Sequence, residues 1–382
     1  MDMRGHSTSL RPERRCWRRG RFYSRYPMAT LGITGLANTG KTSLFAALTA
    51  RPGGIAPFPF STTEARLAVT PIVDPILQEL GRLEGSARIT PATLEVTDGP
   101  PLQEPGGDLD ARTVGKLRQA DCMVVVLRAF EDPSVPHGGS GTDPRAQAEE
   151  VLLAMAISDA QMFEGSLLRL RNQATSRPER RAAYETVGRA AEISGDGDLL
   201  RERRWSDLER KALADFAPLT LKPVIWVVNV DEEQVEEGPN PVEGAVPAGD
   251  PVLTMTLRLE AEAAMLDEPD RAEMLQAFGL GRGAAAAISF AVLDTLAMCT
   301  FYTSNSRETR AWITPMGSNA RQAAGKVHSD MERGFIRAEV GTARAVIEAG
   351  GWDAARARGV VRVEGRDYPV QSGDVLQVRF SV

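Results

Sequence analysis

From Ala29 onward, short apolar runs rich in β-branched residues alternate with longer stretches of helical periodicity. This alternation is typical of a parallel sheet whose strands are joined by crossover helices. The apolar runs predict strands at 30–34, 93–98, 122–130, 224–230 and 252–257. We therefore expect an α/β fold built on a doubly wound sheet.

More than ninety residues, rich in Ala, Glu, Arg and Leu, separate the third of these strands from the fourth. Helical periodicity covers 143–172 and 177–216. Apolar side chains recur near helical spacing on the first stretch, at Leu152, Met155, Met162 and Leu170. We expect an antiparallel helical hairpin that projects from the sheet. Such an apolar stripe usually belongs to a core, whereas a partner-binding arm is the sharper interpretation.

The C-terminal part of the chain has a different pattern. An apolar helical stretch at 284–298 is followed by short runs that predict strands at 309–314, 335–340, 360–365 and 375–382. Gly-containing turns separate these runs. We expect a small mixed α+β module that ends in a strand.

Composition and charge limit what such a chain can do. Of its 382 residues, 42% are hydrophobic and 25% charged, which are ordinary globular proportions for two or three domains. The net charge is −6, but residues 1–27 carry eight Arg against Asp2 and Glu13, about +6. The remainder therefore carries about −12 (−6 minus +6), so a nucleic-acid contact needs a local basic surface.

The N-terminal segment 1–27 is basic but lacks the apolar stretch that a secretory signal needs. A basic arm or a transit-like segment would fit, but we favour a disordered extension upstream of Met28, where the first strand opens. The cysteines, Cys16, Cys122 and Cys299, form no C-x-x-C pair, which suits a reducing, cytoplasmic compartment. No apolar run approaches the length of about 18 residues that a membrane span needs, so no membrane partner is expected.

The stretch GLANTGKT, from Gly35 to Thr42, matches G-x-x-x-x-G-K-[ST]. In such a loop, successive backbone N–H groups cradle phosphates at the positive end of the following helix. Lys41 would contact the β- and γ-phosphate oxygens, and the Thr42 hydroxyl would ligate Mg²⁺. An ordinary Gly turn is the weaker interpretation, because a predicted strand precedes the motif and a helix follows it. The expected phosphate contacts are Asn38, Thr39, Gly40, Lys41, Thr42 and Ser43.

Further stretches extend this pattern: PFPFSTTEARLAVTPIVDP, LRAFEDPSVPH, LKPVIWVVNVDEE and above all RQAAGKVHSDMERGFIRAEV. Together with the loop they resemble the YchF, or Obg-like ATPase, family of translation-factor-class P-loop NTPases. The resemblance covers about 29–382 and is most specific in its C-terminal part. It implies a P-loop NTPase sheet at 28–140 and 220–297, a helical coiled-coil insertion at 141–219, and a ubiquitin-like (β-grasp) TGS domain at 298–382.

The resemblance also implies roles for single residues. Thr62 matches the switch I threonine that completes the Mg²⁺ shell beside the γ-phosphate, although a Ser/Thr loop turn explains it equally well from the residues alone. Asn38 matches an asparagine that holds a monovalent cation in potassium-stimulated members of the wider class. Asp98 matches the Mg²⁺-associated aspartate of the D-x-x-G motif, and Lys41 and Asp98 are the expected catalytic residues.

Base recognition is expected at Asn229, Val230 and Glu232, where guanine-specific relatives carry Asn-Lys-x-Asp. In those relatives the carboxylate pairs with the N1–H and 2-amino donors of guanine. This chain lacks the Lys and ends the motif with the longer Glu232, a departure that the family shares and that implies a preference for ATP over GTP. An acidic turn is the competing interpretation, because the segment continues as DEEQVEE. The base-supporting loop is matched only loosely, with Arg258 in place of its Lys.

The D-x-x-G motif is broken in this chain, because its glycine falls on Pro101. In this class the glycine N–H donates to the γ-phosphate, and proline has no N–H. Losing one charge-assisted hydrogen bond of about 1.5–3 kcal/mol would weaken γ-phosphate sensing by one to two orders of magnitude. Leu102 follows, so no glutamine is placed there to orient water. We expect hydrolysis to be slow at best.

Basic residues cluster near the C-terminus, at Arg321, Lys326, Arg333 and Arg337. On charge alone, a solvated face offset by nearby carboxylates is the simpler interpretation, whereas the resemblance implies a ribosome or structured-RNA partner. No DNA sequence specificity is expected. Two functions follow: an ATP-binding protein with weak Mg²⁺-dependent ATPase activity and a ribosome or RNA partner, or a nucleotide-binding regulatory scaffold that has lost hydrolysis and switching.

Overall fold

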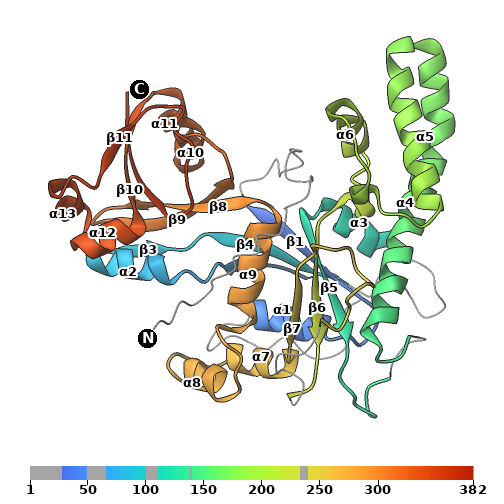
Figure 1. The fold of residues 1–382 in the computed structure, drawn as a ribbon, viewed down its shortest axis with the longest axis horizontal. Coiled ribbons are helices and arrows are strands. Elements are labelled where there is room, and N and C mark those ends of the chain that lie inside the picture. The colour runs from blue at the N-terminus through green and yellow to red at the C-terminus, as the bar shows by residue number, and fades with distance from the viewer. Residues whose placement is uncertain (1–27, 50–65, 100–110, 137–139, 233–239, 382) are drawn as a thin grey trace, which may run out of the picture.

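The computed structural model describes residues 28–49, 66–99, 111–136, 140–232 and 240–381 (Figure 1). Within them, two six-stranded sheets are present, and a long helical hairpin projects from the side of the first. Thr62, Pro101, Leu102 and the segment 1–27 lie outside the described residues.

The first sheet has the strand order β2-β4-β1-β5-β6-β7. Its strands are β1 (Ala29–Thr34), β2 (Arg66–Pro71), β4 (Thr93–Asp98), β5 (Cys122–Arg128), β6 (Val224–Asn229) and β7 (Val252–Met255). All run parallel except β2, which pairs antiparallel with β4. The five predicted strands are confirmed. The pattern missed β2 because its large apolar residues, Leu67 and Val69, are exposed while the smaller Ala68 and Thr70 face the core.

Helices cover both faces of this sheet, as the alternation along β5 shows. Side chains at 122, 124 and 126 pack in one core with α1 (Lys41–Thr49) and α9 (Gly283–Thr295). Side chains at 123, 125 and 127 pack in a second core with α3 (Ala111–Gln119) and α4 (Pro144–Ser176). Every residue of β5 is buried, as expected for a central strand of a doubly wound sheet. Two further helices, α7 (Leu257–Ala264) and α8 (Asp270–Ala277), follow β7.

The hairpin consists of α4 and α5 (Arg181–Gly195), with α6 (Asp207–Ala214) packed against α5. Phe163, Val187, Trp205 and Leu213 form a small core between the three helices. By length and composition α4 could cross a membrane, and 44% of its apolar window is buried inside the fold. The expected antiparallel hairpin is therefore confirmed, with its apolar stripe used for internal packing.

The second sheet has the order β11-β10-β12-β8-β9-β3. Its strands are β3 (Arg88–Thr90), β8 (Met298–Ser304), β9 (Glu308–Pro315), β10 (Phe335–Thr342), β11 (Arg362–Glu364) and β12 (Asp374–Phe380). Four short helices accompany it, α10 (Ala320–Val327), α11 (Ser329–Arg333), α12 (Ala343–Ala349) and α13 (Trp352–Ala357). The four predicted strands are present within a few residues of their expected limits. The predicted helix at 284–298 ends early, because Ala297 adopts a left-handed φ of 48° and β8 begins at the next residue.

The segment that follows β2 links the two sheets. After β2, the chain forms α2 (Pro75–Leu83), which packs against α12 and β9, and then contributes β3 to the second sheet. The Tyr302 hydroxyl donates to Asp74 Oδ2 at 2.8 Å, and the backbone N–H of Trp352 donates to Glu84 Oε1 at 2.5 Å. The apolar core of the first sheet accordingly continues into the second sheet.

Candidate nucleotide-binding site

The glycine-rich loop follows β1 at the carboxyl edge of the first sheet, and α1 begins at Lys41. Gly35 has a φ of +143°, and a Cβ there would lie 2.4 Å from the Val126 carbonyl oxygen. Gly40 has a φ of +102°, and a Cβ there would lie 2.4 Å from Asn229 Nδ2. Both motif glycines are therefore required by the backbone conformation and by the closeness of the neighbouring strands.

Asn229, at the end of β6, holds this loop in place. Its Nδ2 donates to the Thr39 carbonyl at 3.0 Å, and its Oδ1 accepts from the Leu257 N–H at 3.1 Å. The side chain is buried, so both hydrogen bonds are protected from water. Asn229 thus connects the loop after β1 to the first residue of α7.

Lys41 follows the loop as the first residue of α1 and is almost fully buried. Its ammonium group donates to the Leu36 carbonyl oxygen of the same loop. Burial lowers the pKa of Lys41 to about 8, although the nearby Asp98 carboxylate acts in the opposite direction. A buried cation whose main partner is a neutral carbonyl is available to an incoming anion.

Asp98 stands beside this cation at the end of β4, where it is paired in register with Ile33 of β1. Its side chain is fully buried, and neither carboxylate oxygen has a hydrogen-bond partner among the described residues. Burial raises the pKa of Asp98, while Lys41, Arg66 and the Thr42 hydroxyl oppose that shift. A buried carboxylate without partners is costly in a folded protein, and such a cost is usual at a site that awaits a ligand.

The segment after β5 borders the loop from the other side, and it depends on a residue that the sequence analysis did not single out. Arg128 is buried at the end of β5, and its guanidinium donates to the carbonyls of Phe130, Asp132, Val135 and Pro136 at 3.0–3.3 Å. Pro136 also accepts from Asn38 Nδ2 at 3.0 Å. Arg128 therefore shapes a loop that contacts the phosphate-binding loop. The sequence does contain a feature that could have identified Arg128, because it is a charged residue at the end of an otherwise apolar strand.

The expected base-recognition residues lie at the end of β6. Val230 is buried and its N–H donates to the Met255 carbonyl at 3.0 Å. Glu232 is exposed and forms an ion pair with Arg258, in the first turn of α7. Asn229 therefore links two backbone segments by hydrogen bonds, whereas Glu232 forms an ion pair with Arg258.

The structure brings the described candidates to one edge of the sheet. Asn38, Thr39, Gly40, Lys41, Thr42 and Ser43 form the loop and the first turn of α1, Asp98 ends β4, and Asn229, Val230 and Glu232 follow β6. Among the described residues, no group of three or more His, Cys, Asp or Glu could hold a metal ion. A divalent cation here would therefore rely on few protein ligands, as Mg²⁺ does when phosphates complete its shell.

Known proteins are similar to this chain along nearly its whole length. The chain is 32% identical over 359 residues to "Ribosome-binding ATPase YchF" of Haemophilus influenzae, with 92% of this chain and 99% of that protein covered. The chain belongs to the YchF family. A relative of the same name from Bacillus subtilis is 30% identical over 363 residues, with the same coverage.

Two further comparisons concern the fold of the YchF family. The model YchF-GTPase_C, described as a protein of unknown function (DUF933), matches residues 298–381. The solved Schizosaccharomyces pombe YchF GTPase matches with a TM-score of 0.79 at 24% identity, covering 94% of this chain and 99% of that one. The fold is therefore that of a P-loop NTPase with a helical insertion and a C-terminal domain.

Proposed function

We propose that this chain binds ATP at the site formed by the loop after β1 and hydrolyses it slowly in the presence of Mg²⁺. The observation that carries this proposal is the closeness of two buried, oppositely charged side chains, Lys41 and Asp98, beside a phosphate-binding loop, with no hydrogen-bond partner for the Asp98 oxygens among the described residues. The Haemophilus influenzae and Bacillus subtilis relatives, whose names describe an ATPase, support it.

The residues present fit a Mg²⁺ ion. The two free oxygens of Asp98 and the hydroxyl of Thr42, which lies next to that carboxylate, are the oxygen ligands that Mg²⁺ prefers. A bound Mg²⁺ would neutralise charge on the phosphates. Lys41 would contribute a fixed positive charge, and Thr62 is proposed to complete the shell. For K⁺ we propose Asn38 as a ligand. Its side-chain Nδ2 donates to the Pro136 carbonyl, and its side-chain oxygen would bind the cation.

The Glu232–Arg258 ion pair supports a preference for ATP over GTP. Guanine recognition requires a carboxylate that is free to accept two hydrogen bonds, and Arg258 occupies the carboxylate of Glu232. A site whose polar groups are already paired rejects a base that demands them. ATP preference therefore follows from the partner of Glu232 as well as from its length.

Turnover is proposed to be slow because Pro101 replaces the glycine of the D-x-x-G motif. The alternative is a nucleotide-binding regulatory scaffold without hydrolysis or switching, and the same proline favours it. Single-turnover measurement of phosphate release from ATP decides between them, with the Lys41→Ala variant as the control. Release equal to that of the control would overturn the ATPase proposal and leave the scaffold.

We further propose a ribosome or structured-RNA partner and a cytoplasmic location. The relatives named as ribosome-binding support the first, and the two described cysteines, which are free and buried, suit a reducing compartment. The segment 298–382, proposed as a TGS domain, carries the basic residues Lys326 on α10 and Arg337 on β10, for which the described residues provide no ion pair. Co-sedimentation with ribosomes, with and without ATP, tests this partner.

A further inference from the structure

We propose that Arg66, the first residue of β2, binds the γ-phosphate of ATP and supplies a hydrogen-bond donor that the D-x-x-G segment of this chain lacks. The inference deepens the proposed function, because it rests on ATP binding at the loop after β1. It assigns to β2 a part in recognising the triphosphate. It does not depend on whether the bound nucleotide is hydrolysed.

The pairing of β2 with β4 places Arg66 next to Asp98. The two strands run antiparallel, and Arg66 is the register partner of Asp98, the last residue of β4. Directly paired residues of an antiparallel ladder have their side chains on the same face of the sheet. Arg66 therefore lies at the carboxyl edge of the first sheet, on the face to which Asp98 also belongs.

This face is the one that α1 covers. Thr70 shares the face with Arg66, because it follows four residues later on the same strand, and its hydroxyl donates to the Leu48 carbonyl of α1. Lys41 is the first residue of that helix. Burial raises the pKa of Asp98, and the charges of Lys41 and Arg66 oppose that shift. Both cations thus act on the same buried carboxylate from different elements.

The guanidinium of Arg66 has unused hydrogen-bonding capacity. Its Nη1 is buried and has no hydrogen-bond partner among the described residues. An arginine that served only to hold Asp98 would donate to that carboxylate, but neither Asp98 oxygen has such a partner there. A buried donor without an acceptor is costly, and the planar fork of a guanidinium matches the oxygens of a phosphate. The unpartnered donor therefore points to an anionic ligand.

The sequence explains why a donor from β2 is needed. A glycine at the end of the D-x-x-G motif would donate its backbone N–H to the γ-phosphate, and Pro101 has no N–H. Arg66 belongs to a strand and needs no contribution from that segment. A guanidinium–phosphate contact is charged on both sides and is among the strong hydrogen bonds. Arginines supplied to the γ-phosphate in phosphoryl-transfer proteins neutralise charge in the same way.

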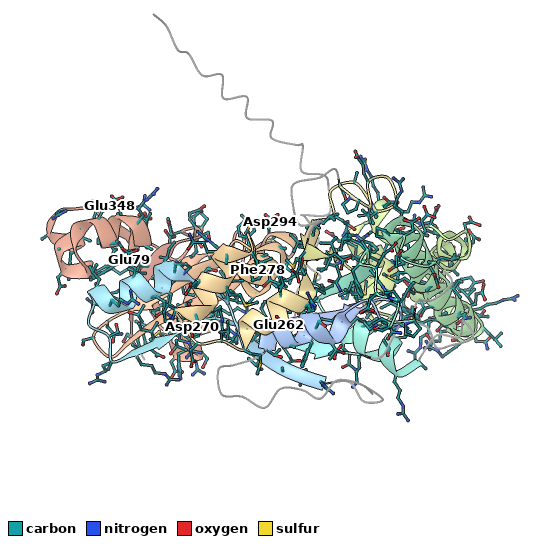
Figure 2. The ribbon with its side chains drawn as sticks, turned by 90° about the horizontal axis from the view of Figure 1, so that it is seen from below. Glu79, Glu262, Asp270, Phe278, Asp294 and Glu348 are labelled. Atoms are coloured by element: carbon teal, nitrogen blue, oxygen red, sulfur yellow. The ribbon has the colours of Figure 1, made fainter. Side chains whose placement is uncertain are left out.

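The charge of the rest of the molecule makes such a local cation important. The chain has a net charge of −6, and one side of it carries the exposed carboxylates labelled in Figure 2: Glu79, Glu262, Asp270, Asp294 and Glu348. An acidic surface repels an anionic nucleotide. The affinity for ATP must therefore come from donors and cations at the site itself, to which Arg66 adds a second positive charge beside Lys41.

The test compares two nucleotides that differ in the γ-phosphate. Calorimetry measures the affinity of the full-length protein for the β,γ-imido analogue of ATP and for ADP, both with Mg²⁺. We expect Arg66→Gln to weaken binding of the ATP analogue at least about tenfold, because a charge-assisted hydrogen bond is lost. Its affinity for ADP should change by less than about twofold. Arg66→Lys keeps the charge but not the fork, so its loss for the ATP analogue should be smaller.

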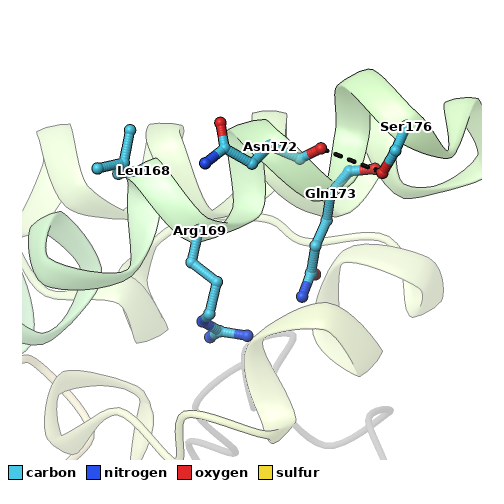
Figure 3. A pocket seen from close by; sticks show the side chains of 5 residues that line it. All are labelled: Leu168, Arg169, Asn172, Gln173 and Ser176. Atoms are coloured by element: carbon cyan, nitrogen blue, oxygen red, sulfur yellow. Dashed lines mark hydrogen bonds between the residues drawn. The ribbon is translucent and has the colours of Figure 1, made fainter.

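Arg169→Gln is the matched control. Figure 3 shows this exposed arginine on α4, where it lines an open depression of about 500 Å³ on the hairpin. Its removal should change both affinities by less than about twofold. Melting of each variant without nucleotide reports on folding. If Arg66→Gln is unfolded at the assay temperature, the ratio of the two affinities in Arg66→Lys decides.

Three outcomes would contradict the inference. Equal weakening of both nucleotides in Arg66→Gln would mean that Arg66 acts only through Asp98 or the loop, and an unchanged ratio of affinities would remove it from the site. In both cases ATP binding by the wild type, and with it the proposed function, would stand. A wild-type protein that binds neither nucleotide would overturn the proposed function and this inference together.

Discussion

The side-chain amide of Asn229 donates to the Thr39 carbonyl oxygen at 3.0 Å, across 190 residues of chain. The same side chain accepts from the Leu257 N–H. A Cβ at Gly40 would lie 2.4 Å from the amide nitrogen, so the loop can approach this closely only with glycine. One buried side chain therefore determines the relative positions of the phosphate-binding loop, β6 and α7.

Replacing Asn229 with Ala should destabilise the protein and the site together. The Thr39 carbonyl and the Leu257 N–H would both lose buried partners, at about 1–3 kcal/mol each. We expect a lower free energy of unfolding in urea and at least a tenfold weaker affinity for a fluorescent ATP analogue. Asn172→Ala, on an exposed part of α4, is the control and should change neither quantity. Unaltered nucleotide affinity in Asn229→Ala would contradict the positioning role.

The Asp98→Asn variant should weaken the Mg²⁺ dependence of ATP binding without lowering the stability of the free protein. Burial without partners raises the pKa of Asp98, so the charged form destabilises the free protein progressively as pH rises through that pKa. The amide removes this charge at nearly constant shape. We expect the melting temperature of the free protein to be equal or higher at neutral pH. The enhancement of ATP affinity by Mg²⁺ should fall at least tenfold, and a variant that keeps the full enhancement would refute Asp98 as part of the metal site.

The pKa of Lys41 predicts how the affinity for ATP changes with pH. Its pKa in the free protein is about 8, and a bound polyphosphate favours the protonated ammonium and so raises that pKa. Below pH 8 the group is already mostly charged and affinity should be flat. Above pH 8 binding must take up a proton, so affinity should fall by up to about tenfold per pH unit.

Calorimetry of ATP binding in two buffers of different ionisation enthalpy, near pH 9, measures that proton uptake directly. Uptake should approach one proton for the wild type. It should vanish in Lys41→Arg, because a guanidinium stays protonated at this pH. Affinity that is independent of pH up to about 9.5 would contradict the assignment.

Arg258→Ala should weaken the discrimination between ATP and GTP. Removing the guanidinium frees the Glu232 carboxylate, which can then accept from the N1–H and 2-amino groups of guanine. We expect the ratio of GTP to ATP dissociation constants to fall by about tenfold in competitive titrations. Arg282→Ala removes an exposed arginine elsewhere and should leave the ratio unchanged. An unchanged ratio in Arg258→Ala would remove Arg258 from base selection.

The base of the hairpin should depend on Asp159. This buried carboxylate of α4 pairs with Arg118 of α3 at 2.7 Å and accepts from the Leu219 and Thr220 N–H groups at 3.0 and 2.8 Å. Asp159→Ala leaves the two N–H groups without their partner and takes the counter-charge from Arg118, which keeps only its neutral acceptors Ser158 and Ala217, so we expect a loss of about 3–5 kcal/mol in urea unfolding. Glu348→Ala breaks the exposed Arg344–Glu348 pair and should cost less than about 1 kcal/mol. Similar losses in both variants would contradict this difference.

The sequence pattern was sufficient to predict an element wherever the conformation of a segment depends on its own residues. Five of the six strands of the first sheet and the two main helices of the hairpin were predicted, because continuous burial and helical periodicity are properties of neighbouring residues. The loop from Gly35 to Thr42 was predicted for the same reason, because its glycines adopt the backbone conformations that the motif requires. β8 was missed because its apolar run continues that of α9, and the left-handed turn at Ala297 has no local signal.

The sequence by itself determined the type of sheet, the phosphate-binding loop and the residues able to serve it. Only the tertiary structure decided the partners of those residues: Lys41 lies beside Asp98, Asn229 contacts Thr39, and Arg258 pairs with Glu232. It also added Arg128, whose four carbonyl partners lie in the following loop. The reason is physical, because the charge state and hydrogen bonding of a side chain depend on groups that are distant in sequence and close in space.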